Sequence, residues 1–190
     1  MPAFLNLPLD TERLILRPYR PEDTSAVFGM FSDAAVMRYW STLPWTDTAQ
    51  AVDAVKRDID AHAAGLYLRL AIERKDNHAF LGQCILFNFA DSSWRAEIGY
   101  SLASSAWGRG YMHEALKKLV RYGFMSLNLN RIEADIDPRN TASAKSLERL
   151  GFVREGLMRE RWIVGEEVSD TAFFGLLRTD WTHRTFPGPH

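Results

Sequence analysis

The stretch that decides the fold reads Ser105-Ala106-Trp107-Gly108-Arg109-Gly110-Tyr111-Met112-His113-Glu114-Ala115. Its two glycines, Gly108 and Gly110, let the backbone approach a ligand closely, and the helix that follows begins with N–H groups that have no partner within the helix. Together with the helix dipole and the charge of Arg109, these N–H groups favour an anion. We therefore predict a phosphate-binding turn between a strand and a helix, with a plain tight turn as the alternative.

The residues on both sides of this turn predict a β–α–β unit. Residues 95–102 form a strand pattern before it, and residues 109–127 place apolar side chains on one helical face after it. Residues 131–136 then form the next strand pattern. Because a helical crossover of this kind joins parallel strands, we expect these two strands to be parallel.

The rest of the chain predicts elements that extend this unit with antiparallel neighbours. β-Favouring runs and helical spacing predict strands at residues 12–17, 66–73, 80–89, 153–164 and 168–177, and helices at 22–32, 47–62 and 140–150. The expected fold class is therefore α/β (α+β). We expect a single mixed, mostly antiparallel sheet of about seven strands with the parallel pair at its centre, flanked by about four helices.

The composition fits one folded domain. The chain has 190 residues, 46% of them hydrophobic, and its 23 Lys and Arg nearly balance 24 Asp and Glu. We expect a single domain over residues 1–182, a disordered tail over residues 183–190, and no basic surplus that would bind nucleic acid. No apolar run is long enough for a membrane span, and the lone Cys84 lies in a short apolar run, so we expect a cytoplasmic protein with Cys84 in its core. The five histidines are scattered, so we expect no metal site.

A dinucleotide-binding turn is another interpretation of the two glycines. Glu133 and Asp135 lie at a suitable distance downstream to contact a ribose, but His113 stands where that pattern has its third glycine. The chain also has a single β–α–β unit instead of a series, and it contains no Walker A sequence. Both features disfavour this interpretation.

Four segments in the same order resemble the Gcn5-related N-acetyltransferase (GNAT) superfamily, and within it the RimJ/RimL-like ribosomal-protein N-acetyltransferases. They are Thr11-Glu12-Arg13-Leu14-Ile15-Leu16-Arg17, Glu97-Ile98-Gly99-Tyr100, the glycine-rich turn with Glu114-Ala115, and Asn140-Thr141-Ala142-Ser143 with Leu150-Gly151-Phe152. The similarity runs from about Leu9 to Trp181, and the expected order of strands and helices is that of the family's fold. The resemblance implies transfer of an acetyl group from acetyl-CoA to a primary amine.

The resemblance also implies where acetyl-CoA binds. The pyrophosphate would lie on backbone N–H groups of the turn, at Gly108, Arg109, Gly110, Tyr111 and Met112. The pantetheine arm would run between two parallel strands that splay apart near Leu102 and Ile136, and Asn140 would contact the cofactor. The family's Gln or Arg at the start of the turn is Ser105 here, a departure shared with the RimJ/RimL-like group.

In the reaction that the resemblance implies, Glu97 is our first candidate for the base that deprotonates the amine. The backbone N–H of Leu102 is the expected donor to the developing oxyanion. Leu147 stands where many relatives carry a tyrosine that protonates the leaving thiol, so Ser143 becomes the candidate acid as well as a cofactor contact. A solvated or ion-paired strand carboxylate is the alternative for Glu97, a plain helix cap for Asn140, and an ordinary serine of the first helical turn for Ser143.

The acceptor amine is expected between the aromatic loop at residues 37–45, the first two helices and the strand residues 159–162. The candidate substrate-binding residues are Tyr39, Trp40, Trp45, Glu160 and Trp162, with Glu160 as a second candidate for the base, although Trp162 aligns nearer the carboxylate of the ribosomal enzymes. Three classes of function stay open: acetylation of a protein or peptide N-terminus, acetylation of a small amine such as a polyamine, an amino acid or an antibiotic, and CoA binding without catalysis. Both a monomer and a homodimer are compatible with the sequence.

Overall fold

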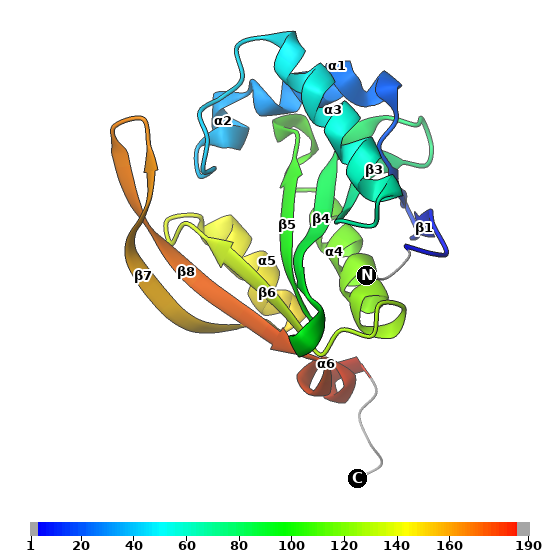
Figure 1. Ribbon diagram of the computed structural model, residues 1–190, viewed down its shortest axis with the longest axis vertical. Helices are drawn as coiled ribbons and strands as arrows, with labels where there is room; N and C mark the ends of the chain where they lie inside the picture. The colour runs from blue at the N-terminus through cyan, green and yellow to red at the C-terminus, as the bar shows by residue number, and fades with distance from the viewer. Residues whose placement is uncertain (1–3, 186–190) are drawn as a thin grey trace.

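The computed structural model describes residues 4–185 and contains an eight-stranded sheet with helices on both faces (Figure 1). The strands are β1 (Leu9–Asp10), β2 (Leu14–Pro18), β3 (Leu68–Arg74), β4 (Phe80–Ala90), β5 (Arg95–Leu102), β6 (Arg131–Ile136), β7 (Val153–Val164) and β8 (Glu167–Leu177). The helices are α1 (Thr24–Phe31), α2 (Ala34–Met37), α3 (Thr48–Ala63), α4 (Tyr111–Met125), α5 (Thr141–Leu150) and α6 (Arg178–Thr185). Short 3₁₀ turns occur at η1 (Pro21–Asp23), η2 (Asp91–Ser93) and η3 (Ser104–Ala106).

The strands lie in the order β1-β2-β3-β4-β5-β6-β8-β7, and β5 and β6 are parallel while the other neighbours are antiparallel. This arrangement confirms the mixed, mostly antiparallel sheet and the parallel pair. The sequence did not predict β1, α2 or α6, because two residues or one or two turns are too short for a periodic pattern. Helix α6 continues to Thr185, past the domain end expected at residue 182, and residues 186–190 of the expected tail lie outside the described residues.

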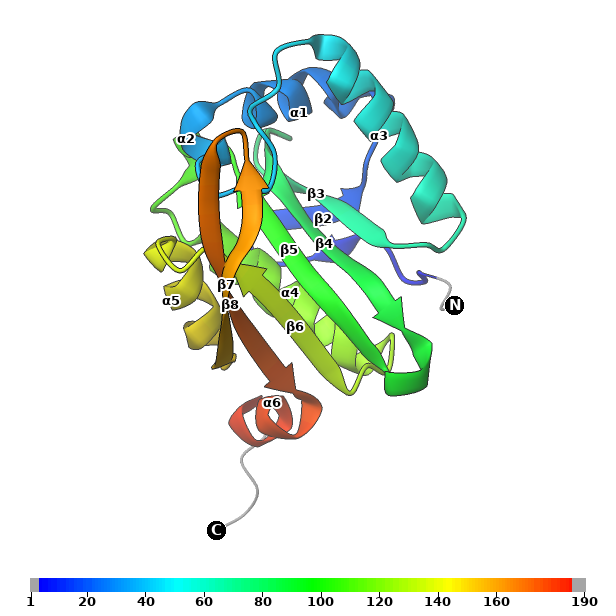
Figure 2. The ribbon, with the colours of Figure 1, turned by 60° about the vertical axis from the view of Figure 1, so that its left-hand side comes forward.

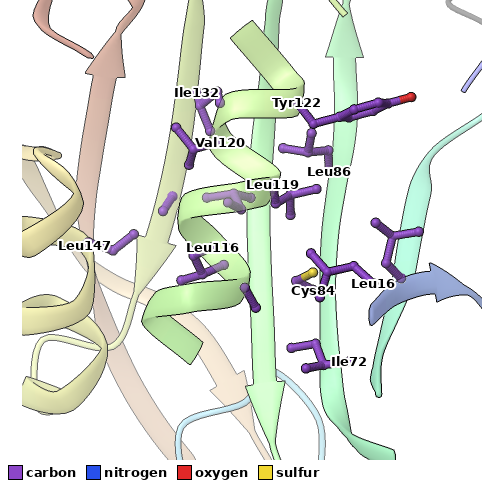
Figure 3. Packing of buried hydrophobic residues seen from close by; sticks show 14 of the residues in the cluster. Leu16, Ile72, Cys84, Leu86, Leu116, Leu119, Val120, Tyr122, Ile132 and Leu147 are labelled. Atoms are coloured by element: carbon purple, nitrogen blue, oxygen red, sulfur yellow. The ribbon is translucent and has the colours of Figure 1, made fainter. Parts of the chain in front are cut away.

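Two hydrophobic clusters hold the helices on the sheet. Figure 2 shows α4 behind the strands and α1 and α3 across the upper part of the opposite face. The larger cluster joins the sheet to α4 and α5 through residues such as Leu116, Leu119 and Leu147 (Figure 3). Cys84 is fully buried in it, which confirms its predicted place in the core. The smaller cluster packs α1 and α3 on the sheet through residues such as Val27, Val55 and Ala71.

The two parallel strands are paired at their N-terminal ends and separate toward their C-terminal ends. Strands β5 and β6 are paired from Arg95 and Arg131 up to Glu97 and Glu133. Beyond that point β5 stays with β4 to its end, and β6 stays with β8 to Ile136. The two strands therefore diverge and leave a gap in the middle of the sheet.

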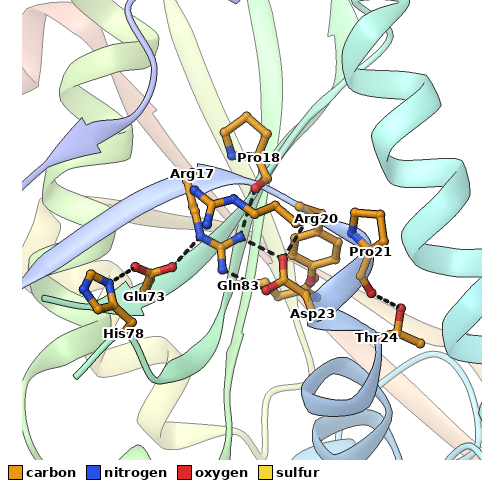
Figure 4. A network of polar contacts seen from close by, with 10 residues as sticks. Arg17, Pro18, Arg20, Pro21, Asp23, Thr24, Glu73, His78 and Gln83 are labelled. Atoms are coloured by element: carbon orange, nitrogen blue, oxygen red, sulfur yellow. Dashed lines mark hydrogen bonds and ion pairs between the residues drawn. The ribbon is translucent and has the colours of Figure 1, made fainter.

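A buried ion-pair network ties β2 to β3 and to η1 (Figure 4). The guanidinium of Arg17 donates two hydrogen bonds of 2.8 Å to the two carboxylate oxygens of Asp23 and one of 2.5 Å from Nε to Glu73 Oε2. His78 Nδ1 lies 2.7 Å from the other oxygen of Glu73. Burial by itself would raise the pKa of Glu73, but the hydrogen bonds from His78 and Arg17 lower it below its ordinary value. This network fixes the polypeptide just before α1.

Within residues 4–185, no helix combines the length and the apolar character that crossing a membrane requires.

Candidate active site

The glycine-rich turn ends in a helix N-terminus with free N–H groups. Gly108 and Gly110 have φ angles of 74° and 77°, a left-handed conformation that glycine adopts at little cost, and Gly110 is the residue that caps α4. The first backbone N–H groups of α4, from Tyr111 to His113, have no carbonyl partner within the helix. This geometry is compatible with an anion at the turn, and phosphate binding there stays a prediction.

Glu114 clamps this turn to the start of β2. Its carboxylate accepts hydrogen bonds from Thr11 Oγ1 at 2.6 Å, from the backbone N–H of Arg13 at 2.8 Å and from Arg13 Nε at 2.7 Å. Arg13 also donates to the carbonyl of Arg109 at 3.1 Å and lies 4.6 Å from the centroid of the Tyr111 ring. Although burial would raise the pKa of Glu114, these hydrogen bonds lower it, so the clamp is ionised at neutral pH. The segment from Thr11 to Arg17 and Glu114, which both belong to the resemblance, are thus in direct contact.

We expect Gly110→Ala to weaken acetyl-CoA binding about 10-fold. A left-handed residue with a Cβ costs about 1–2 kcal/mol, so the turn either relaxes away from its phosphate-binding shape or destabilises the protein. Calorimetric titration with acetyl-CoA and a urea unfolding curve measure both effects. Gly29→Ala is the control, since its Cβ would meet nothing within 4 Å. Unchanged affinity together with unchanged stability in Gly110→Ala would contradict the assignment.

Backbone polar groups face the gap between β5 and β6. Ala103 N–H donates to the carbonyl of Leu81, so Ala103 and Leu81 form a hydrogen-bonded pair of the antiparallel β4–β5 ladder. Because hydrogen-bonded and non-hydrogen-bonded pairs alternate, the backbone N–H and C=O groups of Leu102 and Tyr100 point away from β4 and toward the gap. The same alternation in the β6–β8 ladder turns the backbone of Asp135 toward β5. The gap is therefore bordered by donors and acceptors that an extended amide chain can pair with.

A cavity of about 690 Å³ runs through this region from α5 to the aromatic loop. Of the residues predicted from the sequence, it brings together Tyr39, Trp40, Glu97, Asn140, Ser143 and Trp162. The residues of the glycine-rich turn (108–112) and Leu102 lie outside its lining. Glu97 accepts a 3.1 Å hydrogen bond from Asn88 Nδ2 and is half-buried.

Two predicted acceptor residues do not line the cavity. Trp45 stacks on Phe31 of α1 with ring centroids 4.6 Å apart, so its ring belongs to the small cluster under α1 and α3. Glu160 lies in an irregular stretch of β7, with φ of 52° and its N–H bonded to Asp170 Oδ1 at 2.8 Å. This bulge leaves Glu160 exposed while Trp162 borders the cavity.

Tyr100 is a site residue to which the sequence assigned no role. Its hydroxyl lies 2.7 Å from Ser143 Oγ, and both residues line the cavity. Burial raises the pKa of Tyr100 to about 12, only partly offset by the Ser143 hydrogen bond, so the hydroxyl keeps its proton at neutral pH. Asn140 caps α5 by accepting the N–H of Ser143 at 3.1 Å, which positions this pair. The alternation of β5 is the signal that could have placed Tyr100 toward α5.

The sheet thus opens at the parallel pair, and a glycine-rich turn that begins a helix lies beside this part of the sheet. Residues 13–153 match the model of the Acetyltransferase (GNAT) domain. The uncharacterized N-acetyltransferase p20 of Bacillus licheniformis is 41% identical over 174 residues, which cover 91% of this chain and 97% of the relative. The [ribosomal protein uS5]-alanine N-acetyltransferase of Escherichia coli is 30% identical over 122 residues, 64% of this chain and 63% of the relative. The crystal structure of spermidine N-acetyltransferase from Vibrio cholerae with CoA and spermine has a TM-score of 0.80 at 19% identity, covering 90% of this chain and 99% of the other.

The chain therefore belongs to the GNAT acetyltransferase family. It is an N-acetyltransferase that takes its acetyl group from acetyl-CoA. Among residues 4–185, no three His, Cys, Asp or Glu side chains gather in a way that could hold a metal ion.

Proposed function

We propose that the protein acetylates the N-terminal amine of a protein or peptide by direct transfer from acetyl-CoA in a ternary complex. The observation that supports direct transfer is the cavity that passes through the gap between β5 and β6. Its α5 end carries Tyr100 and Ser143, and its other end carries Glu97 and the aromatic loop. A thioester in the gap is then open to an amine that arrives from the side of the loop, so no acylated residue of the protein is needed.

The residues around the gap supply the groups that the reaction requires. Glu97 accepts the proton that the amine loses before it attacks. The backbone N–H of Leu102 donates to the oxygen that becomes negative in the transition state. The hydroxyl pair of Tyr100 and Ser143 conveys a proton to the leaving thiolate. With Glu97 on one face of the sheet and the hydroxyls on the other, base and acid act on opposite ends of the reacting group.

The charges of the cavity favour a peptide over a polyamine. Four arginines and four carboxylates line it, namely Arg38, Arg69, Arg139, Arg161, Glu97, Asp135, Asp137 and Glu167. A polyamine carries several positive charges and would be matched by a lining with acidic excess, whereas a peptide with mixed charges suits a balanced one. The similarity to an enzyme that acetylates a ribosomal protein supports the same choice. The spermidine enzyme, at 19% identity, is a likeness of fold alone.

A small zwitterionic amine is the second candidate. The turn between β7 and β8 reaches the aromatic loop, where a Cβ added to Gly165 would lie 3.8 Å from Cδ2 of Leu43. Because these two segments come close together at the rim, the cavity is narrowed at that point. A closed pocket suits a small molecule better than a long chain.

The deciding experiment pairs calorimetric titration of acetyl-CoA with measurement of thiol release. The acceptors are peptides with free N-termini, amino acids, polyamines and aminoglycosides. Turnover with peptides alone supports the proposal, turnover with amino acids supports the second candidate, and turnover with polyamines or aminoglycosides contradicts the argument from the balanced charges of the cavity. Binding of acetyl-CoA with no turnover against any of these amines would overturn both.

We expect Tyr100→Phe to lower kcat about 10-fold with little change in the affinity for acetyl-CoA. The substitution removes the hydroxyl that lies 2.7 Å from Ser143 Oγ while it keeps the ring, and Ser143 stays as a poorer proton donor. Tyr122→Phe is the matched control, because that hydroxyl donates to the carbonyl of Leu5 at 2.8 Å, away from the cavity. If the two variants turn over equally fast, the hydroxyl of Tyr100 has no part in proton transfer.

A further inference from the structure

Asp135 is a second carboxylate in the cavity, on the opposite strand from Glu97. Its neighbour Ala134 is buried in the core, so the alternation of β6 places Asp135 on the other face of the sheet. Glu133, two residues earlier, is the register partner of Glu97 and shares its face. Glu97 and Asp135 therefore stand on the same face, one on each side of the gap.

Gly99 leaves room between these two carboxylates. The parallel register pairs Glu97 with Glu133, so the next positions on that face, Gly99 and Asp135, are opposite each other where the strands part. A Cβ on Gly99 would lie 3.1 Å from Cγ2 of Ile85, closer than a side chain normally packs. Glycine thus keeps the floor of the cavity open beside Asp135.

The carboxylate of Asp135 is mostly buried, yet its positive partner lies at the limit of ion-pair distance. Its side chain is 26% exposed, and its ion-pair partner within residues 4–185 is Arg161, whose Nε lies 4.0 Å away. The guanidinium of Arg161 is also 5.3 Å from the centroid of the Phe173 ring and 5.8 Å from that of Trp162, so aromatic contacts compete for it. Burial raises the pKa of Asp135, and Arg161 opposes this only in part. A carboxylate in such surroundings gains stability from a second cation.

We propose that Asp135 binds the ammonium group of the acceptor beside Glu97, which makes it a residue that determines acceptor affinity. This inference rests on the proposed function. The bound ammonium passes one proton to Glu97, and the neutral amine forms a C–N bond to the thioester carbon as the C–S bond breaks. The nitrogen releases a second proton, which reaches the leaving thiolate through the hydroxyls of Tyr100 and Ser143. Asp135 keeps its charge throughout and holds the amine over Gly99.

The test is Asp135→Asn, assayed with the acceptor that the panel experiment identifies. We expect KM for the acceptor to rise about 10- to 100-fold, kcat to change less than about 3-fold, and the Kd of acetyl-CoA to stay the same. Asp135→Glu should recover part of the affinity, because it restores the charge. Asp53→Asn is the control, since Asp53 is exposed on α3 and outside the cavity. An unchanged acceptor KM in Asp135→Asn overturns the inference and leaves the proposed function intact, whereas wild-type protein that acetylates no amine removes both.

A binding measurement tests the same idea without turnover. The complex with CoA is titrated with tetra-alanine and with N-acetyl-tetra-alanine while tryptophan fluorescence is recorded, since Trp40 and Trp162 line the cavity. Wild-type protein should prefer the free amine, and Asp135→Asn should lose that preference. An equal preference in both proteins, or none in the wild type, contradicts binding of the ammonium by Asp135.

Discussion

Glu97→Gln is expected to lower kcat for acetyl transfer by about 10²- to 10⁴-fold, the range that a positioned general base contributes. The glutamine keeps the size of the side chain and can still accept the 3.1 Å hydrogen bond from Asn88, so the cavity retains its shape. It cannot accept the proton of the amine, and the reaction must then use water as the base. The affinity for acetyl-CoA, measured by calorimetry, should be unchanged because Glu97 lies on the acceptor side of the gap.

Glu133→Gln is the matched control for this experiment. Glu133 is the register partner of Glu97 on β6, but it does not line the cavity and is engaged by Arg95 and by Arg131 Nε at 2.7 Å. Loss of the negative charge of Glu133 should alter the free energy of unfolding slightly and leave kcat within about 3-fold of wild type. If Glu97→Gln and Glu133→Gln have the same kcat, Glu97 is not the base.

Arg17→Met is expected to lower the free energy of unfolding by about 3–5 kcal/mol, the usual cost of removing one partner from a buried ion pair. The Arg17 side chain is 8% exposed, and Asp23 and Glu73 are each 6% exposed. The substitution leaves both carboxylates with little water and without their shared cation. Urea unfolding of the two proteins gives the difference directly.

The pH dependence of this difference provides a second check. In wild-type protein the pKa of Glu73 is lowered on folding, so its contribution to stability is present at neutral pH and is lost as the pH falls through its folded-state pKa. In the variant Glu73 has lost its hydrogen bond from Arg17, so burial favours the protonated form of Glu73 and acidification relieves part of that cost. Both effects make the difference in free energy of unfolding between wild type and Arg17→Met smaller at acid pH. Lys56→Met, which breaks the exposed pair with Asp60, should change stability by only about 0.3–0.5 kcal/mol, and an equally small effect of Arg17→Met would show that the buried network contributes little.

Local patterns predicted the frame of this protein well, because its strands and helices follow simple periodicities. The bounds of β5, β6 and β7 agree with the predicted residues 95–102, 131–136 and 153–164, where side-chain alternation and turn residues delimit each strand. The left-handed conformation of the glycine-rich turn was also predictable, since Gly108 and Gly110 act through backbone conformation and need no distant partner.

Side-chain directions in the acceptor region were not predictable from the same patterns. Trp45 turned out to pack on Phe31, a choice made by the fit of two rings from different segments. The displacement of Glu160 depends on a bulge in β7 that no periodicity announces. The contact of Tyr100 with Ser143 joins residues 43 positions apart, so it exists only once β5 and α5 have packed. Non-local packing therefore decides which polar groups meet in the cavity.

The hairpin of β7 and β8 allows the proposed acceptor side of the cavity to vary separately from the proposed cofactor side. β7 is the last strand of the sheet and pairs with β8 alone, and the hairpin lies almost wholly beyond residues 13–153, which match the family model. In the part of the hairpin that extends past β6, before Ala172 of β8, its length, its bulge and side chains such as Trp162 can change without disturbing the glycine-rich turn or the gap between β5 and β6. Changes confined to this protruding part of the hairpin can therefore alter the acceptor while the binding of acetyl-CoA is kept.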